Sequence, residues 1–133
     1  MQDNKDKKDF SKQCYKNEQE QKVLRKGLRD YRKANPNFAK GFIELWRKSK
    51  EGTSIPKVYK ELMELSITIV QRCRPCIFLH TRLCLEAGAT IEQLLEATQV
   101  GVVMGGGPSY QYLGYVMEAI EVYKNKIEKK RGE

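Results

Sequence analysis

The sequence predicts an all-α fold of about six helices, and three observations lead to that prediction. Apolar residues recur three and four positions apart in several segments, the spacing that places them on one face of a helix. No segment shows the alternation of apolar and polar residues that is typical of a half-buried strand. Proline and glycine residues interrupt the helical patterns at places that suit helix ends. We therefore expect helices joined by short turns.

The N-terminal region divides at about residue 16. Residues 1–16 are polar and mixed in charge, and we expect a frayed or disordered tail there, which carries Cys14. Residues 17–130 are expected to form a single domain, since a chain of 133 residues can bury one core. The first helix is predicted over 17–33, and Pro36 can open the second at its first turn. Their apolar stripes are Val23, Leu24, Leu28 and Tyr31, then Phe38, Phe42, Leu45 and Trp46.

The third helix is predicted from the Ser54-Ile55-Pro56 start signal to about Gln71. Its stripe, which we expect to be buried, consists of Val58, Leu62, Met63, Leu65, Ile69 and Val70. The helix must stop near Arg72–Arg74, because Pro75 lacks an amide hydrogen and is tolerated only in the first turn of a helix. A fourth helix therefore begins there, with Cys73 near its N-cap, and runs to Ala87.

Two further helices complete the chain. Gly88 suits the position just after a helix end, and Thr90 with Gln93 forms a capping box that opens a helix to about Met104. The run 105–108, Gly-Gly-Gly-Pro, interrupts the pattern, and a last helix follows from Ser109. No strand precedes the three glycines and no Lys-Ser/Thr follows them, so a phosphate-binding loop is a poor interpretation. The apolar face of the last helix consists of Leu113, Val116, Met117, Ile120, Tyr123 and Ile127.

Charge and cysteine content narrow the function classes. The net charge of +8 lies at the two ends, while residues 61–123 carry three basic and seven acidic side chains. The basic residues alternate with acidic ones on helical patterns, which favours a solvated surface over a nucleic-acid interface. No apolar run approaches the roughly 20 residues that span a bilayer, and no secretory signal opens the chain. We expect a cytoplasmic protein whose cysteines are reduced, bound to metal or part of a redox pair.

The reactive residues are concentrated in one stretch. Cys73 and Cys76 form a C-x2-C pair, and the single histidine of the chain, His80, follows four positions later. Unsatisfied amide groups and a partial positive charge at a helix start stabilise a thiolate, and Arg72 and Arg74 add positive charge. Such a pair can switch between dithiol and disulfide.

A metal site is the competing interpretation of this stretch. Cys73, Cys76, His80 and Cys84 are all zinc ligands in type. On one helix, however, Cys73 and Cys84 would lie roughly 16 Å apart at 1.5 Å rise per residue, too far for one ion. We therefore expect no metal among them and place Cys84 in the core, with a spare thiol on the active face as the other possibility.

A carboxylate would be a third partner of these thiols, and Glu61 and Glu64 both precede the turn on the apolar helix. If the helices 56–71 and 75–87 pack antiparallel, Glu61 lies about one turn beyond His80. That order gives a line from Glu61 through His80 to Cys76. Periodicity alone equally allows Glu61 to be a surface residue beside Lys57 and Lys60.

The combined pattern E-x11-C-x2-C-x3-H, from Glu61 to His80, resembles the carboxymuconolactone decarboxylase/alkyl hydroperoxidase D (AhpD-like) family. Further resemblance lies in residues 60–65, in 86–94 and in 105–108, and it extends over about 38–125. It implies an all-α fold, thiol peroxidase and disulfide-reductase activity, and a homo-oligomer, a trimer or hexamer, with sites near subunit contacts.

The resemblance also implies roles for individual residues. Cys76 would attack a peroxide and become a sulfenic acid, and Cys73 would resolve it to a disulfide. Glu61 and His80 would form the proton relay. The redox-active pair would serve in place of a cofactor, and the partners would be a peroxide and a dithiol, thioredoxin-like or lipoyl reductant. Well-characterised members have a second histidine directly before the second cysteine, where this chain has Pro75.

Two function hypotheses follow. The first is a thiol-dependent peroxidase or disulfide oxidoreductase. The second is a non-catalytic oligomer of the same fold that uses the cysteines as a redox switch or to bind metal across subunits. Lactone decarboxylation is not expected, because the decarboxylase branch of the family lacks the cysteine pair.

Overall fold

The computed structural model describes the backbone of residues 2–132 and the side chains from Lys16 to Gly132. This part of the chain forms six α-helices and no strand, as the sequence predicts. The chain divides into two compact units, 1–54 and 55–133. The single domain predicted over 17–130, and the separation of 1–16 as a tail, stay predictions beside this division.

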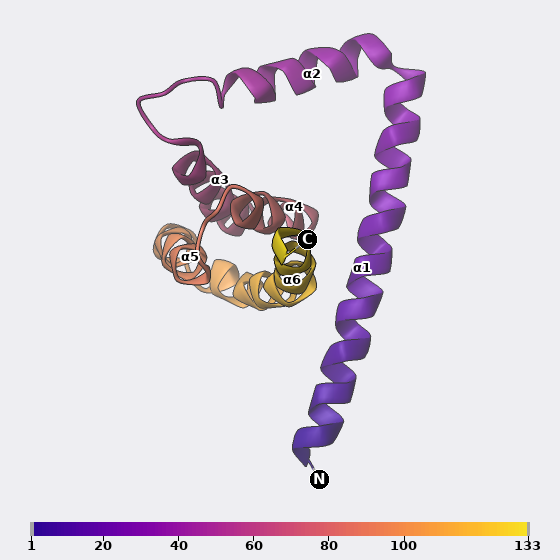
Figure 1. The fold of residues 1–133 in the computed structure, drawn as a ribbon, viewed down its shortest axis with the longest axis vertical. Coiled ribbons are helices and arrows are strands. Elements are labelled where there is room, and N and C mark those ends of the chain that lie inside the picture. The colour runs from indigo at the N-terminus through magenta and orange to yellow at the C-terminus, as the bar shows by residue number, and fades with distance from the viewer. Residues whose placement is uncertain (1, 133) are drawn as a thin grey trace. The chain divides into compact units, whose positions relative to one another are not determined.

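The first unit contains α1 (Gln2–Ala34) and α2 (Pro36–Lys48), which contact each other (Figure 1). The predicted break between them is confirmed, with Asn35 as N-cap of α2 and a proline in its first turn. Helix α1 starts well before residue 17, where the apolar pattern predicts its beginning. The apolar stripe of α2 remains largely exposed, with Phe38 at 70% and Leu45 at 68%.

The second unit is a bundle of four helices, α3 (Lys57–Gln71), α4 (Arg74–Glu86), α5 (Ile91–Gly105) and α6 (Gly107–Gly132) (Figure 1). Helix α3 packs against α4 and α5, and α6 packs mainly against α4 and α5. Each of these four helices contributes side chains to one core. Its fully buried members are Leu65 and Ile69 of α3, Ile77, Phe78 and Cys84 of α4, Leu94 of α5, and Ala119 of α6.

Local signals in the sequence fix the ends of these helices. Gly88 has a φ of 94° and follows α4, so the predicted glycine stop is confirmed. The Thr90 hydroxyl accepts from the Gln93 amide at 3.1 Å, and the Gln93 side chain accepts from the Thr90 amide at 3.0 Å. The predicted capping box therefore opens α5. Gly106, with a φ of 74°, separates α5 from α6.

Helices α3 and α5 approach closely at Gly101. A methyl group there would lie 2.6 Å from the backbone oxygen of Ser66. The exposed side of this helix pair is apolar and forms a shallow groove without charged side chains. The groove is lined by Tyr59, Leu62, Met63, Ser66, Ile67, Ala97 and Val100. Met63 is 49% exposed and Val70 is 38% exposed, so the prediction that both are buried with the α3 stripe is wrong.

Candidate active site

The site is built at the turn between α3 and α4. Arg72 has φ 54° and ψ 42°, a left-handed conformation that ends α3. The Arg72 amide donates to the Ile69 carbonyl at 3.2 Å, and the Cys73 amide donates to the Thr68 carbonyl at 3.2 Å. This pair of hydrogen bonds is a Schellman motif. It reverses the chain within two residues, so α4 starts directly beside the end of α3.

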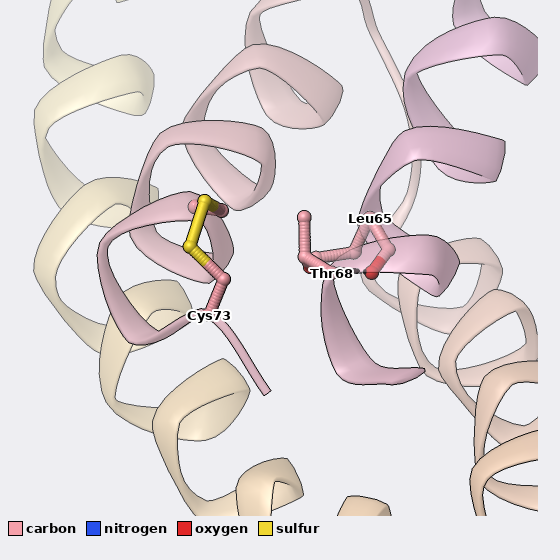
Figure 2. Close-up of a disulfide and its surroundings, with 4 residues drawn as sticks. Leu65, Thr68 and Cys73 are labelled. Atoms are coloured by element: carbon pink, nitrogen blue, oxygen red, sulfur yellow. Dashed lines mark hydrogen bonds between the residues drawn. A yellow bond between two sulfur atoms is a disulfide. The ribbon is translucent and has the colours of Figure 1, made fainter. Parts of the chain in front are cut away.

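Cys73 and Cys76 form a disulfide at the start of α4 (Figure 2). Their Cα atoms are 5.2 Å apart, within the usual range for a disulfide. Cys73 is the N-cap residue, and Pro75 occupies the first turn, as the sequence predicts. Both cysteines are only half-buried, so reagents in solution have access to the pair. In Figure 2 the disulfide faces Thr68 and Leu65 of α3, where the Thr68 hydroxyl donates to the Leu65 carbonyl at 2.6 Å.

Positive charge surrounds this helix start. The guanidinium carbon of Arg74 lies 5.0 Å from the centroid of the Tyr115 ring on α6, a cation–π contact. This contact fixes the Arg74 side chain against the bundle. A positively charged side chain and the unsatisfied amide groups of a helix start are features that stabilise a thiolate over a thiol.

The three residues Glu61, Glu64 and His80 form an acid–histidine cluster between α3 and α4. Nδ1 of His80 lies 3.1 Å from Oε2 of Glu64 and 4.0 Å from Oε2 of Glu61. The Glu61 side chain is 1% exposed, that of His80 13% and that of Glu64 24%. The structure thus brings together Glu61 and His80, which the sequence pairs. It also excludes the alternative that Glu61 is a surface residue.

Glu64 is the member of the cluster that sequence reasoning did not assign a role. A usable signal existed, because residues three positions apart on a helix share a face. If Glu61 faces α4, then Glu64 faces it too. The shorter contact to His80 belongs to Glu64, so this side chain is part of the site.

The acid–histidine cluster also has the composition of a metal site. One ligand atom from each of its three residues lies within 4.8 Å of the others. Carboxylate and imidazole ligands suit several divalent metals. Cys84, by contrast, is 0% exposed in the core. Its predicted core position is therefore confirmed.

The site thus combines a half-buried disulfide, next to arginines at a helix start, with a mostly buried imidazole and two carboxylates. This combination indicates a small helical thiol protein. The sequence matches the carboxymuconolactone decarboxylase family over residues 36–118. The chain belongs to this family. The E-x11-C-x2-C-x3-H pattern of the chain is that of the C-x2-C branch of the family, which the Cys73–Cys76 pair supports.

Known proteins of the family resemble the chain in sequence and in structure. An uncharacterized protein of Cupriavidus necator is 32% identical over 79 residues, which cover 59% of this chain and 70% of that protein. A crystal structure of an apo family protein from Legionella pneumophila is 31% identical with a TM-score of 0.77, covering 81% of this chain and 96% of its own.

A second crystal structure, from Thermotoga maritima, has a TM-score of 0.67 and 28% identity, covering 81% of this chain and 96% of its own. A role in the antioxidative response has been suggested for that protein.

Among the described residues, none of the helices combines the length and apolar character that crossing a bilayer requires.

Proposed function

We propose that this protein is a thiol-dependent peroxidase and disulfide oxidoreductase of the alkyl hydroperoxidase D type. The observation that carries the proposal is the Cys73–Cys76 disulfide at the first turn of α4, one turn before His80. A cysteine pair at a helix start is suited to thiolate formation and to reversible disulfide exchange. The acid–histidine cluster supplies proton donors and acceptors from both α3 and α4.

In the peroxide step, the Cys76 thiolate attacks the outer oxygen of the peroxide. A sulfur–oxygen bond forms and the oxygen–oxygen bond breaks. The alkoxide that leaves takes a proton from the His80 imidazolium and departs as an alcohol. Cys76 remains as a sulfenic acid. Oε2 of Glu64 and Oε2 of Glu61 lie 3.1 and 4.0 Å from Nδ1 of this imidazole.

The resolving step closes the disulfide. The Cys73 sulfur attacks the sulfur of the sulfenic acid, so the sulfur–sulfur bond forms and the sulfur–oxygen bond breaks. The hydroxide takes the proton of the Cys73 thiol and leaves as water. A dithiol reductant then returns the pair to its reduced state by two exchange steps. A reduced dithiol pool of this kind is typical of the cytoplasm.

The test follows the mass of fully reduced protein before and after a stoichiometric pulse of an organic peroxide. We expect a loss of two hydrogens, located by peptide mapping to a Cys73–Cys76 linkage. The Cys76→Ser variant should lose peroxide turnover with a dithiol donor. The proposal is wrong if Cys76→Ser consumes peroxide at the wild-type rate.

We also propose that the active protein is a homo-oligomer that covers the apolar groove of α3 and α5. The groove lining carries no charge, and Val100, one of the lining residues, is 64% exposed. A second copy of the same uncharged face would complement it, as in isologous dimers. Light scattering after size-exclusion chromatography should give a multiple of 15.4 kDa for the wild type. Val100→Asp should shift it toward one chain.

A second candidate function is metal binding without catalysis, and the convergence of ligand atoms in the acid–histidine cluster favours it. Metal analysis of the purified protein distinguishes the two candidates. One bound divalent ion per chain, lost in Glu64→Gln and without peroxide turnover in either form, would replace the peroxidase proposal.

A further inference from the structure

We propose that Glu64 is the proton-transfer group that connects the acid–histidine cluster to water. The inference rests on the peroxidase proposed above. It assigns a role to a residue that the E-x11-C-x2-C-x3-H pattern leaves unspecified, within the interval between Glu61 and Cys73. Glu64 acts through His80 and does not touch the substrate. Burial, distance and the proton balance of the reaction support the assignment.

Burial isolates from solvent the atoms with which the two assigned members of the relay face each other. Nδ1 of His80 and Oε2 of Glu61 are both buried atoms. The Glu61 side chain as a whole is 1% exposed, so it cannot take up protons from bulk water directly. A relay made of Glu61 and His80 alone would hold protons on this side of the ring without exchanging them.

Glu64 has the two properties that the isolated pair lacks. Its side chain is 24% exposed, the largest fraction in the acid–histidine cluster. Its Oε2 also lies 3.1 Å from Nδ1 of His80, whereas Oε2 of Glu61 lies 4.0 Å away. A carboxylate that contacts water and the ring nitrogen together can accept a proton from one and donate it to the other.

The reductive half of the cycle creates the need for this transfer. The two thiols of the reductant release their protons outside the site as they reduce the disulfide. Breaking the Cys73–Cys76 bond leaves two thiolates, and the next cycle requires one proton on the Cys73 sulfur for the resolving step and one on His80 for the leaving alkoxide. Electrons therefore arrive from the reductant and protons arrive separately. We route both protons from water to Glu64 and from Glu64 to Nδ1 of His80, where one passes on to Cys73 and the other remains on the imidazole.

The experiment compares steady-state peroxide turnover of wild type and Glu64→Gln in dilute and in concentrated small buffers at fixed pH and ionic strength. Gln keeps the size of the side chain but cannot carry the proton. We expect kcat to fall about tenfold or more in dilute buffer, with little change in KM for peroxide. Imidazole or acetate should restore kcat as its concentration rises, since these small acids replace the missing carboxylate.

Three further variants make the result specific. Glu64→Asp keeps the carboxyl group and should retain activity that depends little on buffer. Glu61→Gln should lose activity without recovery, because a small buffer cannot reach the buried position. Glu96→Gln removes an exposed carboxylate of α5 and should behave as wild type.

Two outcomes would overturn the inference. Wild-type turnover by Glu64→Gln in dilute buffer would show that protons take another route. A loss that no buffer restores, shared by Glu64→Asp, would show that Glu64 only maintains the structure. Failure of the peroxidase proposal is separate, since it appears as unchanged peroxide consumption in Cys76→Ser.

Discussion

Reduction of the disulfide should cost the protein little stability, because the bond closes a very short loop. Cys73 and Cys76 are three positions apart, so the loop holds four residues, both cysteines included. In the chain-entropy treatment, a loop of this size is worth about 2 kcal/mol, compared with about 4.7 kcal/mol for a loop of 100 residues. Loss of about 2 kcal/mol should lower Tm by roughly 5–10 °C.

The stabilisation of the fold by the disulfide also changes the redox equilibrium of Cys73 and Cys76. By linkage, the disulfide of the folded chain should resist reduction about 30-fold more than that of the unfolded chain, since 1.4 kcal/mol is a factor of ten. The fold thus changes the redox equilibrium modestly. A pair that opens in every turnover needs a fold that survives in both states.

Urea unfolding of the oxidised and the reduced protein, followed by circular dichroism, measures the difference. The Cys73→Ser/Cys76→Ser double variant is the control. It should match the reduced protein within about 1 kcal/mol and should not respond to reductant. Loss of helical structure on reduction, or a difference above about 4 kcal/mol, would refute this reasoning and identify a structural disulfide.

Four other predictions concern the first turn of α4, the acid–histidine cluster and two glycines. Pro75→His places an imidazole next to Cys76 in the first turn of α4, and stopped-flow oxidation by peroxide should become severalfold faster; an unchanged rate would show that thiolate formation is not limiting. Added Zn²⁺ should occupy the acid–histidine cluster and inhibit turnover, whereas a chelator should leave activity intact; activity that disappears with the chelator would contradict the relay. Gly101→Ala should destabilise the bundle by about 1–3 kcal/mol in urea unfolding, because its methyl group meets the Ser66 backbone oxygen. Gly114→Ala, whose methyl group meets nothing within 4 Å, should instead stabilise α6 by up to about 1 kcal/mol.

The ends of the helices in the second unit could be predicted because their signals are local. Pro75 permits only a first turn, Gly88 accepts a positive φ, and Thr90 with Gln93 satisfies the first amides of α5. Each of these effects acts within four residues. No knowledge of the packing is needed to recognise them.

Exposure was harder to predict, because it depends on which neighbours cover a helix. Met63 and Val70 are as apolar as the buried Leu65 and Ile69, but they lie on the side of α3 that the bundle leaves open. Hydrophobicity alone cannot separate the two sides. The early start of α1 was missed for a related reason, since a segment with few apolar residues shows no helical periodicity.

The candidate site was predicted in part. The pattern indicated the cysteine pair and His80, and an antiparallel hairpin brought Glu61 toward them. The pattern could not rank the two carboxylates, because the choice depends on rotamers and on distances of about 1 Å. The structure gives the shorter contact to Glu64.

The left-handed turn at Arg72 explains why the family pattern is written as a fixed number of residues. From Glu61 to Gln71 the chain follows α3, and one reversed residue then delivers Cys73 to the start of α4. Each residue of an α-helix turns the chain by about 100°, so one inserted residue between Glu64 and Arg72 would turn both carboxylates away from His80. The interval of eleven residues therefore determines which face of α3 lies against α4. Substitutions within the interval preserve this orientation, whereas an insertion or a deletion changes it.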